Sequence, residues 1–373
     1  MLNLEDAPPY LLQHGLITPS TVTDGNLSVS SVVRRNRNLF VTRDDGPGYL
    51  LKQPDGPDSV NSLQREAGFC SFCHAEPAAE PLREWIPPLR HLDLAHCVVG
   101  LELFPGATPL WTHYAGFSAE EFPVEVPRRV GQALGTVHSL FRAPELRQDP
   151  RLAWMERCIP WILLVHRPAP EILATLSAAN YQALRVVQGQ PGLSRQLDAL
   201  RAEWRSDTVM HGDVKSGNVL VVPPAEGGGG SRVRLVDWEL VQVGDAAWDV
   251  AGMLQDFVMF WVLSMPGDAA SGDEMANRAR YPLSALQPAV RAFWRAYRYS
   301  AGLTPGEAES TLRRAVRFAG ARLIQSAYEL GQASHALPRA SVLLLQISAN
   351  LLAQPELGQV QLFGLYHEAA SHA

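Results

Sequence analysis

The sequence predicts an α+β protein with a small β-rich N-terminal lobe and a large helical C-terminal lobe that carries an inserted β-hairpin. The first hundred residues hold several short β-prone runs bounded by turn residues. From about residue 127 onward, apolar residues recur at the i, i+3, i+4 spacing of helices. One β-prone island interrupts this helical part. We therefore expect an N-terminal lobe over residues 1–103 and a C-terminal lobe over residues 104–373.

Three runs in the N-terminal part are typical of neighbouring strands: "LSVSSVVRR", "NLFVTRD" and "GYLLKQ". The turn residues "DDGPG" separate the last two. A helix is expected over residues 60–75, then a strand at "CVVGLELF", which leads into a connector near residues 100–106.

The C-terminal part begins with three helical stretches, "PRRVGQALGTVHSLF", "PEILATLSAANYQALRVV" and "LSRQLDALRAEWR". Pro127 and Pro170 are expected to begin the first two. The island "GNVLVVPPAEGGGGSRVRLVDWEL" predicts a hairpin with strands over residues 218–222 and 232–237 and a mobile Gly-rich tip. From residue 280 onward the pattern is again helical.

The composition is that of an ordinary globular protein, with 46% hydrophobic and 19% charged residues among 373. A net charge of −6 argues against nucleic acid as a partner. The N-terminal residues lack the pattern of a signal peptide, and runs such as "FVMFWVLSM" are shorter than the roughly 18–20 residues that cross a membrane. We therefore expect a cytoplasmic protein without a membrane partner.

The segment "CSFCH" matches the spacing of a covalent haem site at Cys70, Cys73 and His74. Haem attachment of this kind belongs to exported proteins, and the same residues fall on one stripe of the expected helix. We interpret both cysteines as small core residues.

Only two of the 32 Lys and Arg residues are lysines, Lys52 and Lys215. Lysine carries a compact point charge, which suits a phosphate oxygen that is reached from one side. In a chain that otherwise uses arginine, the two lysines are candidates for phosphate contacts.

Polar residues surround Lys215 in "HGDVKSGN" and at the end of the partner strand. The hairpin is expected to bring Asn218 and Asp237 together, and their oxygens suit Mg²⁺. Asp213 lies on the preceding loop, where its carboxylate could orient an attacking hydroxyl. Lys215 could neutralise a transferring phosphoryl group. Phosphoryl transfer needs this combination, because its catalysis consists mainly of positioning and charge neutralisation.

"HGDVKSGN", followed by "LVDWE" and "GDAAWDVA", resembles the aminoglycoside phosphotransferase family. That family has a protein-kinase-like fold, which choline-kinase-type enzymes share. The resemblance implies that Asp213 is the catalytic aspartate, with Lys215 near the γ-phosphate, and that Asn218 and Asp237 are metal ligands.

The same resemblance assigns supporting roles around this loop. His211 would shape the loop, and Asp249 would be a buried residue that accepts hydrogen bonds from the loop backbone. Asp245 would form a local turn or helix cap. Glu239 could support the metal site or cap the strand.

The N-terminal part resembles the same template. Lys52 in "YLLKQP" and Glu66 on the following helix look like the pair in which a strand lysine binds the α- and β-phosphates and a helix glutamate holds it. Glu76, Glu80 and Glu84 are alternatives to Glu66. The connector "GLELF" is expected to contact the purine through Glu102 and Leu103, so the cofactors implied are ATP and Mg²⁺.

The sequence departs from the kinase pattern in one place. No G-x-G-x-x-G precedes Lys52, and "RRNRN" (34–38) stands there instead. Asn36 and Asn38, or backbone N–H groups nearby, could cover the phosphates. A solvated hairpin tip is an equal interpretation.

The acceptor is not defined by these motifs. The helical region contributes aromatic residues, of which we expect about a quarter to line a site, and acidic loops at "PGDAASGDEM" (266–275) and "PGEAES" (305–310). The aromatic residues considered are Phe257, Phe260, Trp261, Phe293, Trp294, Tyr297 and Tyr299.

Three hypotheses about function remain. The first is ATP-dependent phosphorylation of a small hydroxyl compound. The second is phosphorylation of Ser or Thr in a precursor peptide of a ribosomal peptide natural product, of lanthipeptide or thioamide type, beside a partner enzyme of that pathway. "YLLQHGLI", "RRNRNLFV" and "GYLLKQ" resemble such proteins. The third is a non-catalytic nucleotide-binding scaffold.

Overall fold

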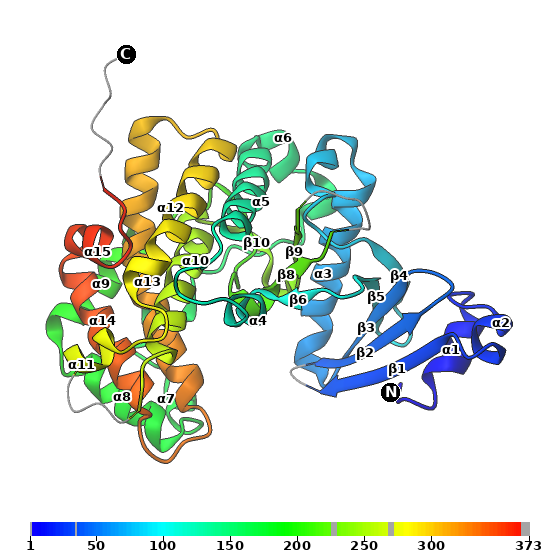
Figure 1. Cartoon of the computed structure of the whole chain (residues 1–373), viewed down its shortest axis with the longest axis horizontal. Helices are drawn as coiled ribbons and strands as arrows, with labels where there is room; N and C mark the ends of the chain where they lie inside the picture. The colour runs from blue at the N-terminus through cyan, green and yellow to red at the C-terminus, as the bar shows by residue number, and fades with distance from the viewer. Residues whose placement is uncertain (1, 34–35, 225–229, 268–271, 367–373) are drawn as a thin grey trace. The chain divides into compact units, whose positions relative to one another are not determined.

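The computed structural model describes residues 2–33, 36–224, 230–267 and 272–366. The chain divides into two compact units, and Figure 1 labels helices and strands of both. The first unit consists of Met1–Pro109, Gln148–Met155 and Asn218–Val241. The second unit consists of Leu110–Arg147, Glu156–Gly217 and Gln242–Ala373. The α+β class is confirmed, because the first unit holds a small antiparallel sheet and helices dominate the second.

The first unit is built on a five-stranded antiparallel sheet of order β1-β2-β3-β5-β4. The register pairs Asn38 of β2 with Lys52 of β3, and Lys52 with Val99 of β5. Helix α3 follows β3 directly (Figure 1). The elements are α1 (Ala7–Gln13), α2 (Pro19–Thr23), β1 (Leu27–Val33), β2 (Asn36–Arg43), β3 (Gly48–Pro54), α3 (Pro57–Ala75), η1 (Pro77–Leu82), β4 (Leu89–Asp93) and β5 (Val98–Leu103).

Helix α1 completes the hydrophobic core on this sheet. Tyr10 and Leu11 of α1 pack in one cluster with Leu39, Val41 and Leu51 of β2 and β3. Burying an aliphatic or aromatic side chain of this size contributes about 1.5–3 kcal/mol. The N-terminal segment is therefore anchored to the strand that carries Lys52.

Helix α3 begins at Pro57, the first helical position, where a missing N–H costs nothing. Its buried stripe includes Leu63, Cys70 and Cys73, together with Glu66, which is fully buried. Both cysteines are free thiols in the core, as the sequence predicted.

The expected hairpin consists of β8 (Val219–Val222) and β9 (Arg232–Leu235), which pair with β6 (Thr108–Pro109) in a three-stranded sheet. By its contacts the hairpin belongs to the first unit, although its sequence lies among helices of the second. Residues 225–229 of the expected tip lie outside the described residues. The remaining elements of this unit are η2 (Pro150–Leu152) and η5 (Trp238–Leu240), while η4 (Ser216–Asn218) leads into β8.

The second unit is helical, with one short antiparallel pair formed by β7 (Thr208–Met210) and β10 (Gln242–Gly244). Its helices are α4 (Leu110–Ala115), α5 (Glu125–Arg142), α6 (Pro144–Arg147), η3 (Trp161–Leu164), α7 (Pro170–Leu173), α8 (Ala178–Gln188), α9 (Pro191–Ala202), α10 (Ala246–Leu263), α11 (Gly272–Asn277), α12 (Leu283–Ser300), α13 (Pro305–Gly331), α14 (Arg339–Ala353) and α15 (Pro355–Gln361).

Strand β9 ends at Leu235, two residues before the expected bound, and two details of the helices also differ from the sequence-based expectation. Helix α5 begins at Glu125, so Pro127 is its third residue rather than its first. The single helix expected from Pro170 is divided into α7 and α8, because the Ser177 side chain caps a new helix by accepting from the Asn180 N–H.

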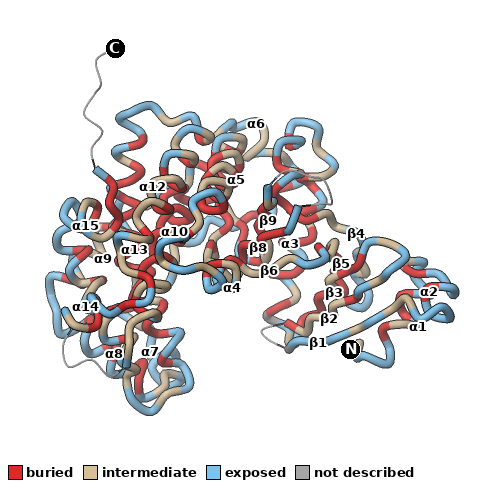
Figure 2. Tube along the Cα trace, in the orientation of Figure 1, coloured by how far each residue is buried: buried red, intermediate tan, exposed pale blue. Residues whose placement is uncertain are grey.

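Helix α10 is the centre of this unit and is buried along most of its length (Figure 2). It is the one helix in the described ranges that is long and apolar enough to cross a membrane, with mean hydropathy 1.2, and 67% of it is buried inside the fold. The Asp245 side chain caps its first turn by accepting from the Ala247 N–H, as the sequence predicted. Arg314 of α13 binds both oxygens of Asp245, at 3.1 and 3.2 Å.

Candidate active site

The first unit gathers three carboxylates around one ammonium. Lys52 Nζ lies 2.8 Å from Glu66 Oε2, 2.7 Å from Asp237 Oδ1 and 3.5 Å from Glu239 Oε1. Lys52 comes from β3, Glu66 from α3, and the other two from the turn after β9. The structure thus pairs Lys52 with Glu66, whereas Glu76 forms an ion pair with Arg151.

The turn after β9 positions Asp237 in an uncommon backbone conformation. Its φ of 68° is in the left-handed region, which costs a non-glycine residue about 1–3 kcal/mol and persists where the surrounding structure holds it. The preceding Val236 N–H donates to the Asn218 carbonyl at 2.9 Å. Asn218 and Asp237 therefore lie at the same end of the β8–β9 hairpin.

The charges in this cluster do not cancel. Burial by itself would lower the pKa of Lys52, but the Glu66, Asp237 and Glu239 carboxylates outweigh it and raise that pKa. Burial, with Asp237 and Glu66 nearby, raises the pKa of Glu239 to about 7. With all three carboxylates ionised and Lys52 protonated, the cluster carries a charge of −2.

This arrangement fits a divalent cation. Glu66 is fully buried against Lys52, whereas the Asp237 side chain is 39% exposed and has a second carboxylate oxygen. Oxygen ligands with a net negative charge suit Mg²⁺, which usually takes one or two carboxylates beside phosphate oxygens. Asn218 and Asp237 could hold such an ion, and Glu66, Asp237 and Glu239 each offer one oxygen within 4.8 Å of the others.

Asn36 and Asn38 lie on β2 beside this cluster. Asn36 is buried and its Nδ2 donates to Glu239 Oε1. Within the described part of the chain, the Oδ1 atoms of both residues are buried without a hydrogen-bond partner. These two residues are therefore not part of a solvated hairpin tip. The Oδ1 atom of each can accept a hydrogen bond from a bound ligand. Arg34 and Arg35 of the same segment lie outside the described residues, and Arg37 lies on β2.

Glu102 and Leu103 end strand β5. The Glu102 side chain forms an ion pair with Arg90, and its backbone N–H donates to the Pro88 carbonyl at 3.0 Å. A purine contact from Glu102 would therefore have to use its carbonyl oxygen.

In the second unit, the loop after β7 is held by a buried carboxylate. Asp249 accepts from the His211 N–H at 2.6 Å and from the Gly212 N–H at 3.0 Å. Gly212 has φ 84°, which favours glycine. Burial by itself would raise the pKa of Asp249, but the His138 ring, 3.2 Å away, and the loop N–H groups outweigh it and lower that pKa. The contact that the sequence assigned to Asp249 is present.

This loop presents Asp213 and Lys215. Asp213 Oδ2 lies 2.7 Å from Lys215 Nζ, and the Asp213 N–H donates to His211 Nδ1 at 3.3 Å. His211 therefore shapes the loop from within, and the two residues singled out from "HGDVKSGN" are direct neighbours.

Asp213 and Lys215 line a cavity of about 580 Å³ within the second unit. Pockets of about 300–1,000 Å³ are typical of small-molecule sites. Its apolar wall includes Trp111, Met259, Phe260, Leu263 and Tyr281, and its polar groups include Gln255, Asp256, Arg280, Arg322, Gln325 and Glu329.

Apart from Asp213, the acidic groups of this cavity are not those that the sequence suggested. Of the seven aromatic residues considered, Phe260 lines the cavity. Asp256 comes from α10 and Glu329 from α13, whereas the described residues of the two acidic loops do not line it. Asp256 was missed because a single acidic residue on an apolar helix gives no signal in a sequence, and Arg280 and Glu329 were missed because they stand in no motif.

Burial raises the pKa of Asp256 to about 6, although its hydrogen bonds with Ser216 oppose the shift. Arg322 donates to the Val214 carbonyl at 2.9 Å and lies over the Trp248 ring. Three acidic side chains, Asp213, Asp256 and Glu329, thus face three basic ones, Lys215, Arg280 and Arg322, in one lining.

Residues 31–293 match the model of the Phosphotransferase enzyme family, which also bears the name APH. The chain belongs to this family. The protein is therefore a phosphotransferase with an alcohol group as acceptor, and the resemblance seen in the sequence is confirmed.

Solved structures show the same fold at low sequence identity. The GDP complex of wild-type aminoglycoside 2'-phosphotransferase-IIIa is 13% identical, with a TM-score of 0.52 over 94% of this chain and 99% of that one. Amicoumacin kinase hAmiN in complex with AMP-PNP, Ca²⁺ and Ami is 12% identical, with a TM-score of 0.52 over 93% of both chains. This chain thus has a protein-kinase-like phosphotransferase fold. The search of curated proteins found no match.

Proposed function

We propose that the protein transfers the γ-phosphate of ATP, bound with Mg²⁺, to a hydroxyl group of a small, largely apolar molecule. The observation that carries this proposal is the position of Asp213, paired with Lys215, on the lining of a cavity of small-molecule size. Because the reaction uses ATP, we also expect it to take place in the cytoplasm.

In this proposal the first unit binds the nucleotide. Lys52 binds phosphate oxygens, and Glu66 holds its ammonium in place. Asn36, Asn38, Glu102 and Leu103 are proposed nucleotide contacts, and Asn218 with Asp237 would hold the metal. Mg²⁺, when bound, supplies positive charge to the phosphate oxygens.

The second unit would provide the chemistry at the acceptor. The Asp213 carboxylate accepts a hydrogen bond from the acceptor hydroxyl and takes its proton as the hydroxyl oxygen bonds to the γ-phosphorus. The bond between the γ-phosphorus and the bridging oxygen then breaks, and ADP leaves with the electron pair. Lys215 is placed to neutralise charge on the transferring group.

The cavity lining supports an acceptor of low net charge. A polycationic aminoglycoside would favour an excess of carboxylates, but here three acidic groups face three basic ones. Trp111, Phe260 and Tyr281 supply aromatic surface on the same lining. A ring-containing alcohol with a broad apolar face matches these features better.

The peptide-kinase hypothesis remains the alternative acceptor class. The scaffold hypothesis requires that Asp213 be dispensable. Both are separated from our proposal by the experiment that follows.

The purified protein is incubated with Mg-ATP and with separate acceptors: hydrophobic macrocyclic alcohols, aminoglycosides, choline and a Ser/Thr-rich peptide. We expect a mass gain of one phosphate on an apolar alcohol, and its loss by at least a hundredfold in Asp213→Asn. The control is Asp198→Asn, which changes an aspartate that contacts Arg167 and His166 away from the cavity. Transfer to the peptide alone, or full activity of Asp213→Asn, would contradict the proposal.

A further inference from the structure

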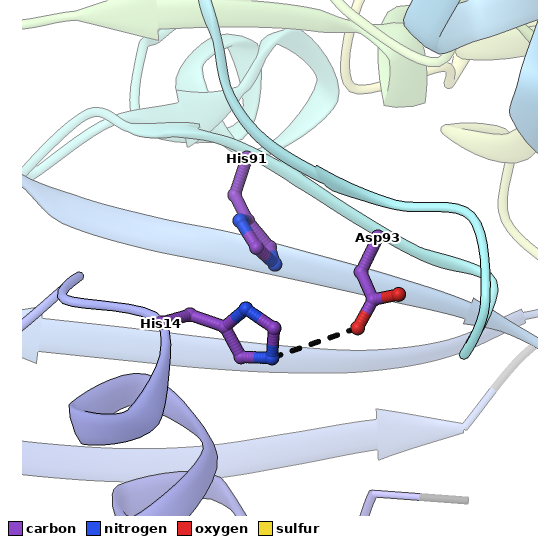
Figure 3. A group of neighbouring side chains, drawn as sticks. All are labelled: His14, His91 and Asp93. Carbon is purple, nitrogen blue, oxygen red and sulfur yellow. Dashed lines mark ion pairs between the residues drawn. The ribbon is translucent and has the colours of Figure 1, made fainter.

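Two histidines and one aspartate meet at the edge of the five-stranded sheet (Figure 3), and none of the three is assigned to catalysis. His14 follows helix α1, while His91 and Asp93 lie on β4. One potential ligand atom from each lies within 4.8 Å of the others. His14 Nε2 and Asp93 Oδ2 are 3.6 Å apart.

Strand β4 is built to present its two residues together. His91 and Asp93 are two positions apart, so their side chains leave the same face of the strand. A β-bulge between Leu89 and His91 resets the register, and bulges re-aim side chains. Gly100 stands opposite, where a Cβ would lie only 2.8 Å from His91 Cβ. The glycine therefore makes room for the His91 side chain.

Helix α1 holds His14 from the other side. The fully buried Leu11 anchors this helix in the sheet core, so the residue that ends the helix is fixed in position. Tyr10 places its hydroxyl 2.7 Å from His91 Nε2 and 3.1 Å from Asp93 Oδ2. His96 Nδ1 lies 2.7 Å from Asp93 Oδ2 and orients that carboxylate from outside.

We propose that His14, His91 and Asp93 form a site for Zn²⁺ or a chemically similar first-row divalent cation. Imidazole nitrogens with one carboxylate oxygen are a common ligand set for such ions, and Mg²⁺ prefers oxygen alone. Tetrahedral Zn²⁺ with bonds of about 2.0–2.1 Å brings its ligand atoms to about 3.3 Å from one another. The separation of 3.6 Å between His14 Nε2 and Asp93 Oδ2 is close to that spacing. Small side-chain rotations would bring a ring nitrogen of His91 to a similar distance.

The fourth ligand would be a water molecule. The bound ion would join α1 to the edge strand β4 and stabilise the first unit. The role is structural and does not depend on which acceptor the enzyme uses.

The test uses tag-free protein in excess Mg²⁺, so that the oxygen site near Asp237 does not take the probe metal. Zn²⁺ binding is measured by calorimetry, and Co²⁺ binding by the visible absorption of a tetrahedral complex. We expect one site, affinity at least tenfold lower in His14→Ala, and no change in His335→Ala, which alters an exposed histidine of the second unit. Zn²⁺ should also raise the midpoint of thermal unfolding in the wild type and not in His14→Ala.

His14 is the first choice because the His91 and Asp93 side chains also take part in hydrogen bonds with Tyr10. Far-ultraviolet circular dichroism checks that His14→Ala is folded, and His91→Gln provides a second variant. Absence of a Zn²⁺ site in the wild type would overturn the proposal. So would equal affinity in the wild type and a folded variant of either histidine.

Discussion

Lys52 is a buried ammonium that holds together residues from a strand, a helix and a hairpin turn. Its contacts with Glu66 and Asp237 are short, and Glu239 is farther away at 3.5 Å. Burial raises the pKa of both Glu66 and Glu239 although the Lys52 ammonium opposes the shift, and the pKa of Glu239 reaches about 7.

Replacing Glu239 with Gln should change how stability depends on pH. Between its ordinary pKa of 4.5 and about 7, the folded wild type keeps a proton that the unfolded chain releases, so the free energy of unfolding falls as pH rises. The stability of Glu239→Gln relative to wild type should therefore increase by about 1–3 kcal/mol across this range. Urea unfolding at several pH values without Mg²⁺ measures this difference, and a difference that stays constant with pH would contradict it.

Sequence reasoning found most of the residues in this cluster but not their balance of charge. Lys52 and Asp237 stand in recognisable motifs. Glu239 was left between two roles, because its position depends on the left-handed conformation of Asp237, which no sequence pattern indicates. The sequence likewise offers several glutamates as partners of Lys52, and the position of Glu66 on helix α3 decides between them.

At the scale of elements, helix α10 connects the core to the loop that presents Asp213 and Lys215. Asp249 in its first turn accepts from two loop N–H groups, and His138 of α5 supports it. Tyr297 of α12 contacts the same His138 ring at 3.0 Å. Three helices thus fix the backbone that leads to Asp213.

Asp249→Asn should loosen this loop. The amide of asparagine keeps the shape of the side chain but has only one acceptor oxygen, so one of the two loop N–H groups loses its hydrogen bond. The free energy of unfolding should fall by about 1–3 kcal/mol. We expect kcat to fall by about 10–100-fold with little change in KM for ATP. Faster hydrogen exchange at the amides of His211 and Gly212 would identify the loop as the cause. Unchanged kcat with unchanged exchange would show that the contact is not needed.

The elements themselves were predicted well where periodicity is strong. The strands of the N-terminal part and helices α3, α5 and α9 have close to the expected bounds. The sequence placed the start of α5 at Pro127, two residues too late. Proline is tolerated at any of the first few positions of a helix, because the N–H groups there have no partner within the helix. Helices α1 and α2 are too short to show a period, and the division between α7 and α8 depends on a cap at Ser177.

At the scale of the molecule, the chain passes between its two units several times. Segments Gln148–Met155 and Asn218–Val241 belong to the first unit, although residues of the second unit flank them. Local patterns predict the hairpin but not the unit it joins, since that is decided by tertiary contacts such as the Lys52–Asp237 pair. The cavity could not be foreseen either, because its lining comes from separate helices.

Mg-ATP should stabilise the protein against thermal unfolding. Binding at 100 times Kd contributes about 2.7 kcal/mol to the free energy of unfolding. We expect a clear rise in the unfolding midpoint with Mg-ATP, a smaller one when EDTA removes the metal, and little rise in Lys52→Met. Differential scanning calorimetry measures all three. An equal rise in the unfolding midpoint with and without the metal would contradict the proposal that Asp237 binds it.

The most direct test of the central claim compares nucleotide binding and phosphate transfer in Lys52→Met and Asp213→Asn. Isothermal titration with Mg-ATP gives the affinity, and release of labelled phosphate to an acceptor gives turnover. We expect Lys52→Met to bind Mg-ATP at least tenfold more weakly. Asp213→Asn should bind it as the wild type does and lose transfer. Wild-type transfer by Asp213→Asn, or wild-type affinity in Lys52→Met, would contradict the account.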